Sequence, residues 1–192
     1  IDQKVLTLQE FGKENFVEEL KWLEKEANKW DKKNSHWFTQ LQDTYGQYPE
    51  WFFLFDDDVP VAFSTIQKYY DGCYRLLTRT YIYRDYRRFT NPKDDTFLSP
   101  TMRLLPYQIE YTKGHWTVFV SMQAGRKKAI ERFTKKLNRN SNLDWRVDSN
   151  MVRTCACKED PDCWQHVTFA GFKLNLNRIT EDDYRKMFNR AN

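Results

Sequence analysis

The sequence predicts one α/β domain, residues 1–192, in which helices flank a mixed central sheet. Apolar, aromatic-rich runs over 50–86 are separated only by two short turn signals, which is typical of an antiparallel meander. A helix-length segment then separates this meander from another buried run at 115–123, which is typical of a crossover between parallel strands. A chain of 192 residues fits one domain of ordinary size.

The composition indicates a folded protein with an aromatic interior, since 40% of the residues are hydrophobic, 30% charged and 17% aromatic. A disordered chain would carry fewer apolar residues. Tyr and Trp bury large areas and keep one polar group that needs a partner. We therefore expect aromatic side chains in the core and in the walls of any pocket.

The charge is mildly basic and nearly balanced, with 31 Lys and Arg against 27 Asp and Glu. This balance favours a small anion bound at one local site, and a nucleic-acid partner is not expected. No apolar run of about 18 residues is present, so no membrane association is expected. The first residues do not resemble a signal peptide, and four cysteines do not form a disulfide scaffold. We expect a cytoplasmic protein.

The N-terminal third predicts a strand followed by two helices. Residues 4–8 alternate in polarity, as a strand does. Between Phe11 and Trp30 the apolar residues recur at helical spacing. Asn34 or Ser35 would cap a second helix over 35–46.

The next three runs predict the meander. Strands are expected over 50–57, 59–70 and 73–86, with turns at Asp56–Asp58 and at Asp71–Gly72. Short turns between successive strands make the neighbours antiparallel.

The crossover helix is expected to start at Ser99 and Pro100, which fit the N-cap and the first helical position. Pro106 predicts a kink or a later start. A helix between two neighbouring strands makes those strands parallel and the connection right-handed. A basic helix over 125–139, a hairpin of strands at 144–156 and 163–176, and a short helix at 180–188 complete the expected order.

Arginines gather where the third meander strand ends. Arg84, Arg87 and Arg88 stand shortly before the start of the crossover helix. The N-terminus of a helix binds phosphate through its free N–H groups, and arginine adds charged, forked donors. The same arginines could instead pair with the nearby carboxylates of Asp85, Asp94 and Asp95, and the sequence leaves both interpretations open.

The element order, the strand LLTRTYIYRDYRR with the helix after it, the strand VFVSMQ and the helix AGRKKAIERF resemble the GNAT N-acetyltransferase superfamily, as a divergent member. The resemblance covers nearly the whole chain. It implies that the strands at 73–86 and 115–123 splay apart, with the pantetheine arm of the cosubstrate acetyl-CoA in the gap.

The resemblance also implies a set of cofactor-binding residues. The backbone around Thr80 and Ile82 would align the pantetheine, and Ser121 and Gln123 would line the gap. The residues implied to face the phosphates are Arg87, Arg88, Thr90 and Asn91 for the pyrophosphate and Arg126 and Lys127 for the 3′-phosphate. Tyr81 and Tyr83, on the same strand, are the candidate catalytic proton donors.

The chain departs from the family pattern at the phosphate loop. After Arg88 it reads FTNPKDDTFLSPT, without the glycines that let the backbone approach a pyrophosphate. The family's late Tyr appears here as Phe133, and its Asn as Ala124 or Gly125. Because of these departures, the resemblance supports the expected fold more strongly than the expected activity. A non-catalytic binding or structural protein on the same fold is the alternative.

Cys155, Cys157, Cys163 and His166 are of the types that bind zinc. Their spacing matches no familiar zinc knuckle, so a hairpin with reduced thiols is favoured and no zinc is expected. A zinc-stabilised nucleic-acid-binding protein would require both this site and the basic helix. It is the lesser alternative.

The sequence therefore predicts an acyl-CoA-dependent N-acyltransferase that moves an acetyl group directly to an amine, either a small molecule or a peptide. It does not identify the general base, the amine or the oligomeric state.

Overall fold

The computed structural model describes residues 2–68, 73–89, 100–112, 115–121, 146–148 and 168–173, together with the single helical residues Lys135 and Arg139. The first half contains β1 (Gln3–Thr7), α1 (Leu8–Phe11), α2 (Lys13–Trp30), α3 (Lys32–Thr44), the 3-10 helix η1 (Tyr45–Gln47), β2 (Trp51–Asp56) and β3 (Val59–Lys68). The second half contains β4 (Cys73–Ile82), the 3-10 helix η2 (Arg84–Phe89), α4 (Pro100–Tyr111), β5 (Trp116–Ser121), β6 (Arg146–Asp148) and β7 (Thr168–Lys173).

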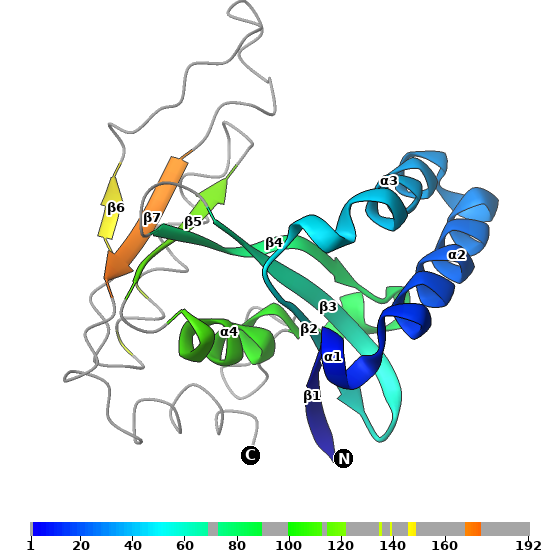
Figure 1. Cartoon of the computed structure of the whole chain (residues 1–192), viewed down its shortest axis with the longest axis horizontal. Helices are drawn as coiled ribbons and strands as arrows, with labels where there is room; N and C mark the ends of the chain where they lie inside the picture. The colour runs from blue at the N-terminus through cyan, green and yellow to red at the C-terminus, as the bar shows by residue number, and fades with distance from the viewer. Residues whose placement is uncertain are drawn as a thin grey trace, which may run out of the picture.

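These strands form one mixed sheet in the order β1-β2-β3-β4-β5-β7-β6 (Figure 1). Strands β1 to β4 are antiparallel neighbours, β4 and β5 are parallel, and β7 pairs antiparallel with both β5 and β6. The predicted fold class is confirmed: an antiparallel meander, a helical crossover, a parallel pair and a C-terminal antiparallel pair. Because α4 connects β4 to its parallel neighbour, it is the predicted crossover helix.

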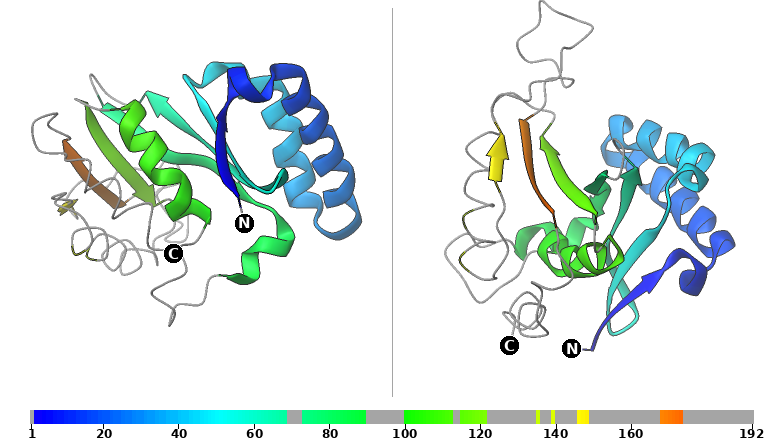
Figure 2. Two further views of the ribbon diagram at one scale, coloured as in Figure 1. Left: turned by 90° about the horizontal axis from the view of Figure 1, so that it is seen from below. Right: turned by 60° about the vertical axis from the view of Figure 1, so that its left-hand side comes forward.

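Helices cover both faces of the meander. Figure 2 shows α2 and α3 on one side of the sheet and α4 on the other. Alternate residues of β2 therefore enter different cores: Phe52 and Leu54 pack with α4, whereas Trp51, Phe53 and Phe55 pack with α2 and α3. A strand covered on both faces has no solvent side, which explains why β2 reads as a continuous apolar run.

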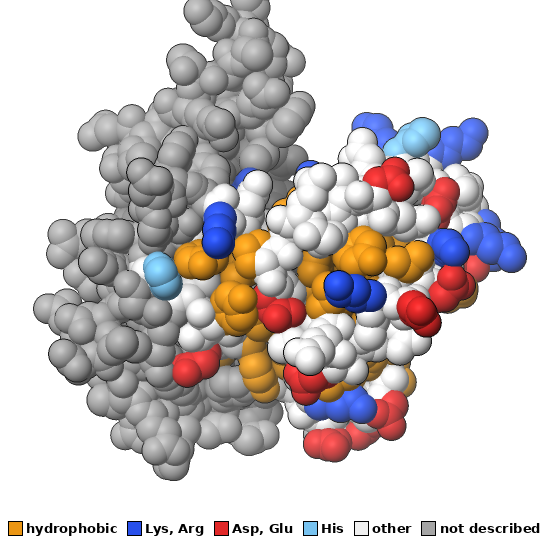
Figure 3. Space-filling view, viewed as in Figure 1, with side chains coloured by type: hydrophobic (Ala, Val, Ile, Leu, Met, Phe, Trp, Pro, Cys, Tyr) orange, Lys and Arg blue, Asp and Glu red, His pale blue; other side chains and the backbone are white. Residues whose placement is uncertain are grey.

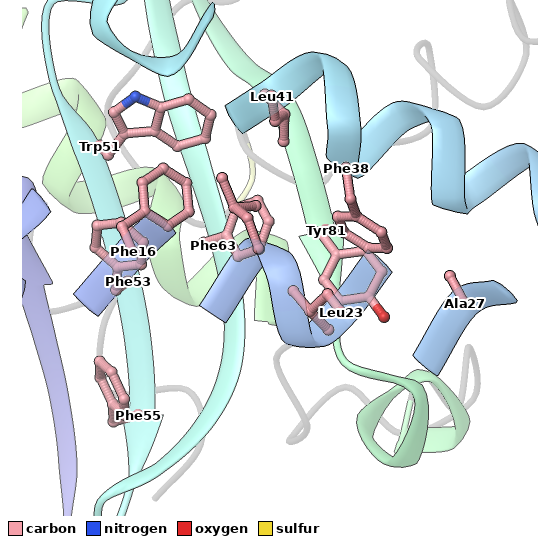
Figure 4. Close-up of a cluster of buried hydrophobic side chains, with 11 residues drawn as sticks. Phe16, Leu23, Ala27, Phe38, Leu41, Trp51, Phe53, Phe55, Phe63 and Tyr81 are labelled. Carbon is pink, nitrogen blue, oxygen red and sulfur yellow. The ribbon is translucent and has the colours of Figure 1, made fainter. Parts of the chain in front are cut away.

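The core beneath α2 and α3 is aromatic, as the composition predicts. Figure 4 shows Phe16 of α2 set among rings from the sheet, with centroids 4.9 Å from those of Trp51 and Phe53. The indole N–H of Trp51 donates to the Tyr45 carbonyl oxygen over 2.8 Å. Edge-to-face and tilted ring pairs of this kind add to the stabilisation from burial.

The boundary of α3 corrects the expected cap. Asp31, not Asn34 or Ser35, is the N-cap residue, and its carboxylate accepts the Lys33 N–H over 3.1 Å. Asp31 alone separates α2 from α3, so the same residue also ends α2. Ser35 is buried inside the helix, and Gly46 lies in η1 after the helix has ended.

Two further boundaries differ from expectation. β4 ends at Ile82, because the chain turns into η2 there; the Arg87 Nε–H donates to the Ile82 carbonyl oxygen over 2.8 Å. The crossover helix begins at Pro100 and continues past Pro106 to Tyr111, so the expectation of a later start is wrong. The turn between β2 and β3 is confirmed, with Asp57 and Asp58 at φ values of 48° and 68°. Asp tolerates this left-handed region better than most residues.

Several expected elements fall outside the described residues. These are the Asp71–Gly72 turn, most of the loop after η2 with Ser99, the basic helix apart from Lys135 and Arg139, parts of the two C-terminal strands, and the closing helix at 180–188. Within the described ranges, none of the helices is long and apolar enough to cross a bilayer.

Candidate functional site

Strand β4 is deformed in its middle. Leu77 and Arg79 have φ values of 53° and 46°, in a region that residues with a Cβ rarely adopt. From the pair Thr65–Thr78 to the pair Gln67–Arg75, the register moves two positions along β3 but three positions along β4. The same mismatch occurs between the pairs Phe63–Tyr81 and Thr65–Thr78. Each mismatch places one extra residue in β4, so the strand contains two successive β-bulges.

A buried polar network holds these bulges. The Leu77 N–H donates to Oε1 of Gln108 on α4 over 2.7 Å, and the Leu77 carbonyl oxygen accepts the Thr80 hydroxyl over 2.8 Å. The Thr78 hydroxyl donates to the Thr65 carbonyl oxygen over 2.8 Å, and the Ser64 and Thr80 hydroxyl oxygens lie 2.7 Å apart. Gln108 is fully buried, and its amide oxygen gives the Leu77 N–H an acceptor although Leu77 has no partner in the β3–β4 register.

The parallel ladder between β4 and β5 stops where the first bulge begins. It consists of the pairs Cys73–Trp116, Tyr74–Thr117 and Arg75–Val118. Both strands continue beyond these pairs, β4 to Ile82 and β5 to Ser121, and Figure 1 shows that they diverge there. The described residues thus show the predicted splay: past Arg75, the β5-facing edge of β4 has no β5 partner.

The end of β4 borders a cavity of about 580 Å³ on the α2 side of the sheet. Its walls include Glu19, Trp22, Glu26 and Trp30 from α2, Tyr81 and Tyr83 from the β4 end, and Arg84 and Asp85 from η2. Small-molecule sites in proteins commonly have volumes of roughly 300–1,000 Å³. The cavity is therefore large enough for a small organic ligand.

Tyr83 is tied to the wall of this cavity. Its hydroxyl donates to Oε1 of Glu19 over 2.6 Å. Burial raises the pKa of Tyr83 far above its ordinary value, and the negative Glu19 carboxylate with its hydrogen bond raises it further. The phenol of Tyr83 therefore stays protonated and serves as a hydrogen-bond donor.

Tyr81, the other candidate catalytic residue, belongs to the aromatic core. In Figure 4 its ring packs beside Phe38 and Phe63 while its hydroxyl points away from them, toward α2. Burial raises the pKa of Tyr81, although the positive charge of Arg87 opposes this shift. The rings of Tyr81 and Tyr83 lie next to each other, with centroids 5.4 Å apart, although Tyr83 follows the last residue of β4.

The arginines at the end of β4 contact aromatic rings. The guanidinium carbons of Arg84 and Arg87 lie 5.0 Å and 5.6 Å from the ring centroid of Trp30, and that of Arg87 lies 5.2 Å from the Tyr81 ring. Stacking of this kind is a favourable cation–π interaction. The sequence proposed phosphate binding or ion pairing for these residues; the structure adds an aromatic environment that neither interpretation included.

The remaining predicted residues are placed only in part. Thr80 and Ile82 lie on β4 beyond the ladder, Arg88 lies in η2 and Ser121 ends β5. The cofactor-binding candidates outside the described residues are Thr90, Asn91, Gln123, Arg126 and Lys127; the same holds for the metal candidates Cys155, Cys157, Cys163 and His166. Among the residues that the structure does describe, no group of three His, Cys, Asp or Glu could hold a metal ion.

Sequence reasoning missed the α2 side of the site and Gln108. Glu19, Trp22, Glu26 and Trp30 recur at steps of three or four residues, which places them on one helix face. This stripe of alternating carboxylates and indoles lies beside the buried stripe of α2 and was the available signal. On the face shown in Figure 3, acidic and basic side chains of the described residues are interspersed, without a basic stripe.

The strand order, the crossover helix and the splayed parallel pair together define a GNAT-like architecture, the class that the sequence resembles. No family model matches the chain, and no curated protein sequence matches it significantly.

Solved structures of acetyltransferases do align with the chain over most of its length. The ribosomal-protein-S18-alanine N-acetyltransferase from Escherichia coli aligns at 15% identity and a TM-score of 0.49, over 94% of this chain and 97% of that one. An acetyltransferase from Streptococcus agalactiae aligns at 11% identity and a TM-score of 0.49, over 90% of this chain and 98% of that one. The N-acetyltransferase PseH from Campylobacter jejuni aligns at 13% identity and a TM-score of 0.42, over 89% of this chain and 97% of that one. Because these scores are modest, the fold assignment rests on the chain's own strand order and pairing.

Replacing Gln108 by Leu should destabilise the protein by about 1–3 kcal/mol, because the part-buried Leu77 N–H would lose its acceptor. The same substitution at Gln40, exposed on α3, should change the free energy of unfolding by less than about 0.5 kcal/mol. Urea unfolding of both variants measures the difference. Equal effects would mean that the glutamine amide does not support the bulge.

Replacing Tyr83 by Phe should weaken the loss of stability in alkali. The folded-state pKa of Tyr83 lies above the ordinary value of 10.0, so its contribution to stability is present below that pH. It is lost as the pH rises further, because the unfolded chain ionises first, at a rate of up to about 1.4 kcal/mol per pH unit. Urea unfolding near neutral pH and at about pH 11 should show a smaller decrease for the variant. Identical decreases would place Tyr83 in contact with solvent.

Proposed function

We propose that the chain is an acyl-CoA-dependent N-acyltransferase that transfers an acetyl group from acetyl-CoA directly to an amine. The net reaction forms an amide C–N bond and breaks the thioester C–S bond. The amine loses one proton, and the CoA sulfur gains one when it leaves as the thiol. The observation that supports this proposal most strongly is the short ladder between β4 and β5.

The splay matters because pantetheine is an extended chain with two amide groups. Such a chain can pair with the backbone of a strand edge as an added strand does. Beyond Arg75, the edge of β4 that includes Thr80 and Ile82 is not paired to β5 in the described residues, and Ser121 ends the opposite strand. These are the positions that the resemblance assigns to the pantetheine arm.

The position of the cavity supports an acceptor on the other side of β4. Tyr81 and Tyr83 flank Ile82, and both line the cavity. A thioester held along the β4 edge at Ile82 would thus lie next to two residues of the cavity wall. We propose that the acetyl-CoA approaches from the side of α4, whose start follows the arginine-containing segment, and that the amine occupies the α2 side.

Calorimetric titration with acetyl-CoA tests this proposal. We expect a dissociation constant in the micromolar range, about −8 kcal/mol, and similar binding of desulfo-CoA, which lacks the reactive sulfur. Release of CoA thiol on addition of an amine should follow. Absence of binding at millimolar acetyl-CoA would contradict the proposal and favour a non-catalytic binding protein on this fold.

Arg88, in η2, is the residue that we propose for the pyrophosphate. Its replacement by Ala should weaken acetyl-CoA binding about tenfold or more, because a hydrogen bond to a charged group contributes about 1.5–3 kcal/mol. Lys33→Ala, which removes the same charge from an exposed position of α3, is the matched control and should leave the affinity unchanged. Equal affinities in the two variants would remove Arg88 from the phosphate site.

A further inference from the structure

We infer that the cavity between α2 and the end of β4 binds a small organic ammonium ion. The inference rests on the proposed function in one respect, that this ligand would be the acetyl acceptor. The binding itself requires no acetyl-CoA. Three features of the cavity lead to the inference: a carboxylate that no described cation pairs with, aromatic walls, and more carboxylates than cations among the described lining residues.

Glu19 is the carboxylate at the centre of the argument. It is half-buried, and its Oε1 accepts the Tyr83 hydroxyl. Among the described residues no Lys, Arg or His forms an ion pair with it. A partly desolvated carboxylate is most strongly stabilised by a charged donor, and an ammonium group in the cavity would supply one.

The walls suit a cation with an apolar body. Trp22 lines the cavity and leaves 52% of its surface exposed, which is unusual for an indole in a folded protein. The rings of Tyr81, Tyr83 and Trp30 add further aromatic surface. Aromatic faces attract cations, and the guanidinium of Arg84 over Trp30 shows that one of these rings already does so.

The charges that line the cavity favour a cation over an anion. Among the described residues that line the cavity, three carry a carboxylate, Glu19, Glu26 and Asp85, and one carries a cation, Arg84. Lys29, 2.7 Å away, offsets the charge of Glu26, which leaves Glu19 and Asp85 against Arg84, and Arg87 lies over the rings of Trp30 and Tyr81. Arg84 and Arg87 keep their charge over the rings, and Glu19 is the half-buried lining carboxylate that no described cation pairs with.

Binding of 2-phenylethylammonium, followed by calorimetry without acetyl-CoA, tests the inference. The probe carries one ammonium group and one ring. Its uncharged analogue 2-phenylethanol and its anionic analogue 3-phenylpropionate serve as comparisons. We expect the ammonium to bind most tightly and the carboxylate least. Preference for the carboxylate, or no binding of the ammonium at millimolar concentration, would overturn the inference.

The Glu19→Gln variant keeps an oxygen that can accept the Tyr83 hydroxyl and removes the charge. It should bind the ammonium about tenfold more weakly or worse, with no change for 2-phenylethanol. Glu18→Gln is the matched control, because Glu18 is the exposed neighbour paired with Lys21 over 3.0 Å. An unchanged ammonium affinity in Glu19→Gln, with a melting temperature equal to that of the wild type, would remove Glu19 from the site.

The outcome for acetyl-CoA is read separately. Glu19→Gln should bind acetyl-CoA as the wild type does, since Glu19 lies on the α2 side of the sheet. If acetyl-CoA fails to bind the wild type while the ammonium binds, the proposed function fails and the ammonium site stands. If acetyl-CoA binds and the ammonium does not, the acceptor site is elsewhere.

Discussion

The amide of Gln108 accepts the backbone N–H of Leu77 inside the protein, and the shape of β4 depends on this contact. Leu77 and Arg79 hold backbone conformations that cost free energy for residues with a Cβ. Hydroxyl groups from β3 and β4 make further hydrogen bonds around the bulges. The helix that carries Gln108 is itself attached to the sheet through Arg103, whose guanidinium pairs with Asp56 and donates to Gln3. Strain in β4 is thus offset by hydrogen bonds from two neighbouring elements.

This deformation connects the two sides of the candidate site. The parallel ladder with β5 ends at Arg75, just before the bulges, and the cavity begins at Tyr81, just after them. The aromatic core beneath α2 and α3 fixes the other wall, because Phe16 and Tyr81 belong to one buried cluster. A ligand edge on one side of β4 and a charged, aromatic cavity on the other therefore follow from one irregular strand between two rigid helical layers.

Local patterns predicted the fold well and the site only in part. The apolar spacing of α2, the continuous run of β2 and the turn at Asp57–Asp58 each reflect forces between near neighbours, so the sequence displays them. The bulges were missed because Leu77 and Arg79 are not residues that signal a positive φ, and their stabilisation comes from Gln108, 31 positions away. Glu19 was missed for a similar reason, since its partner Tyr83 lies 64 positions away. Asp31 was overlooked as a cap because it joins two helices directly.

Amide hydrogen exchange at Leu77 is the measurement that tests this account most directly. The Leu77 N–H is not part of the regular ladder, yet it is bonded to a fully buried side chain. Its exchange should therefore be as slow as that of the amides in the β3–β4 ladder, through opening of the whole sheet. Exchange at the rate of an exposed loop would show that Gln108 does not hold the bulge, and the splay of β4 from β5 would need another cause.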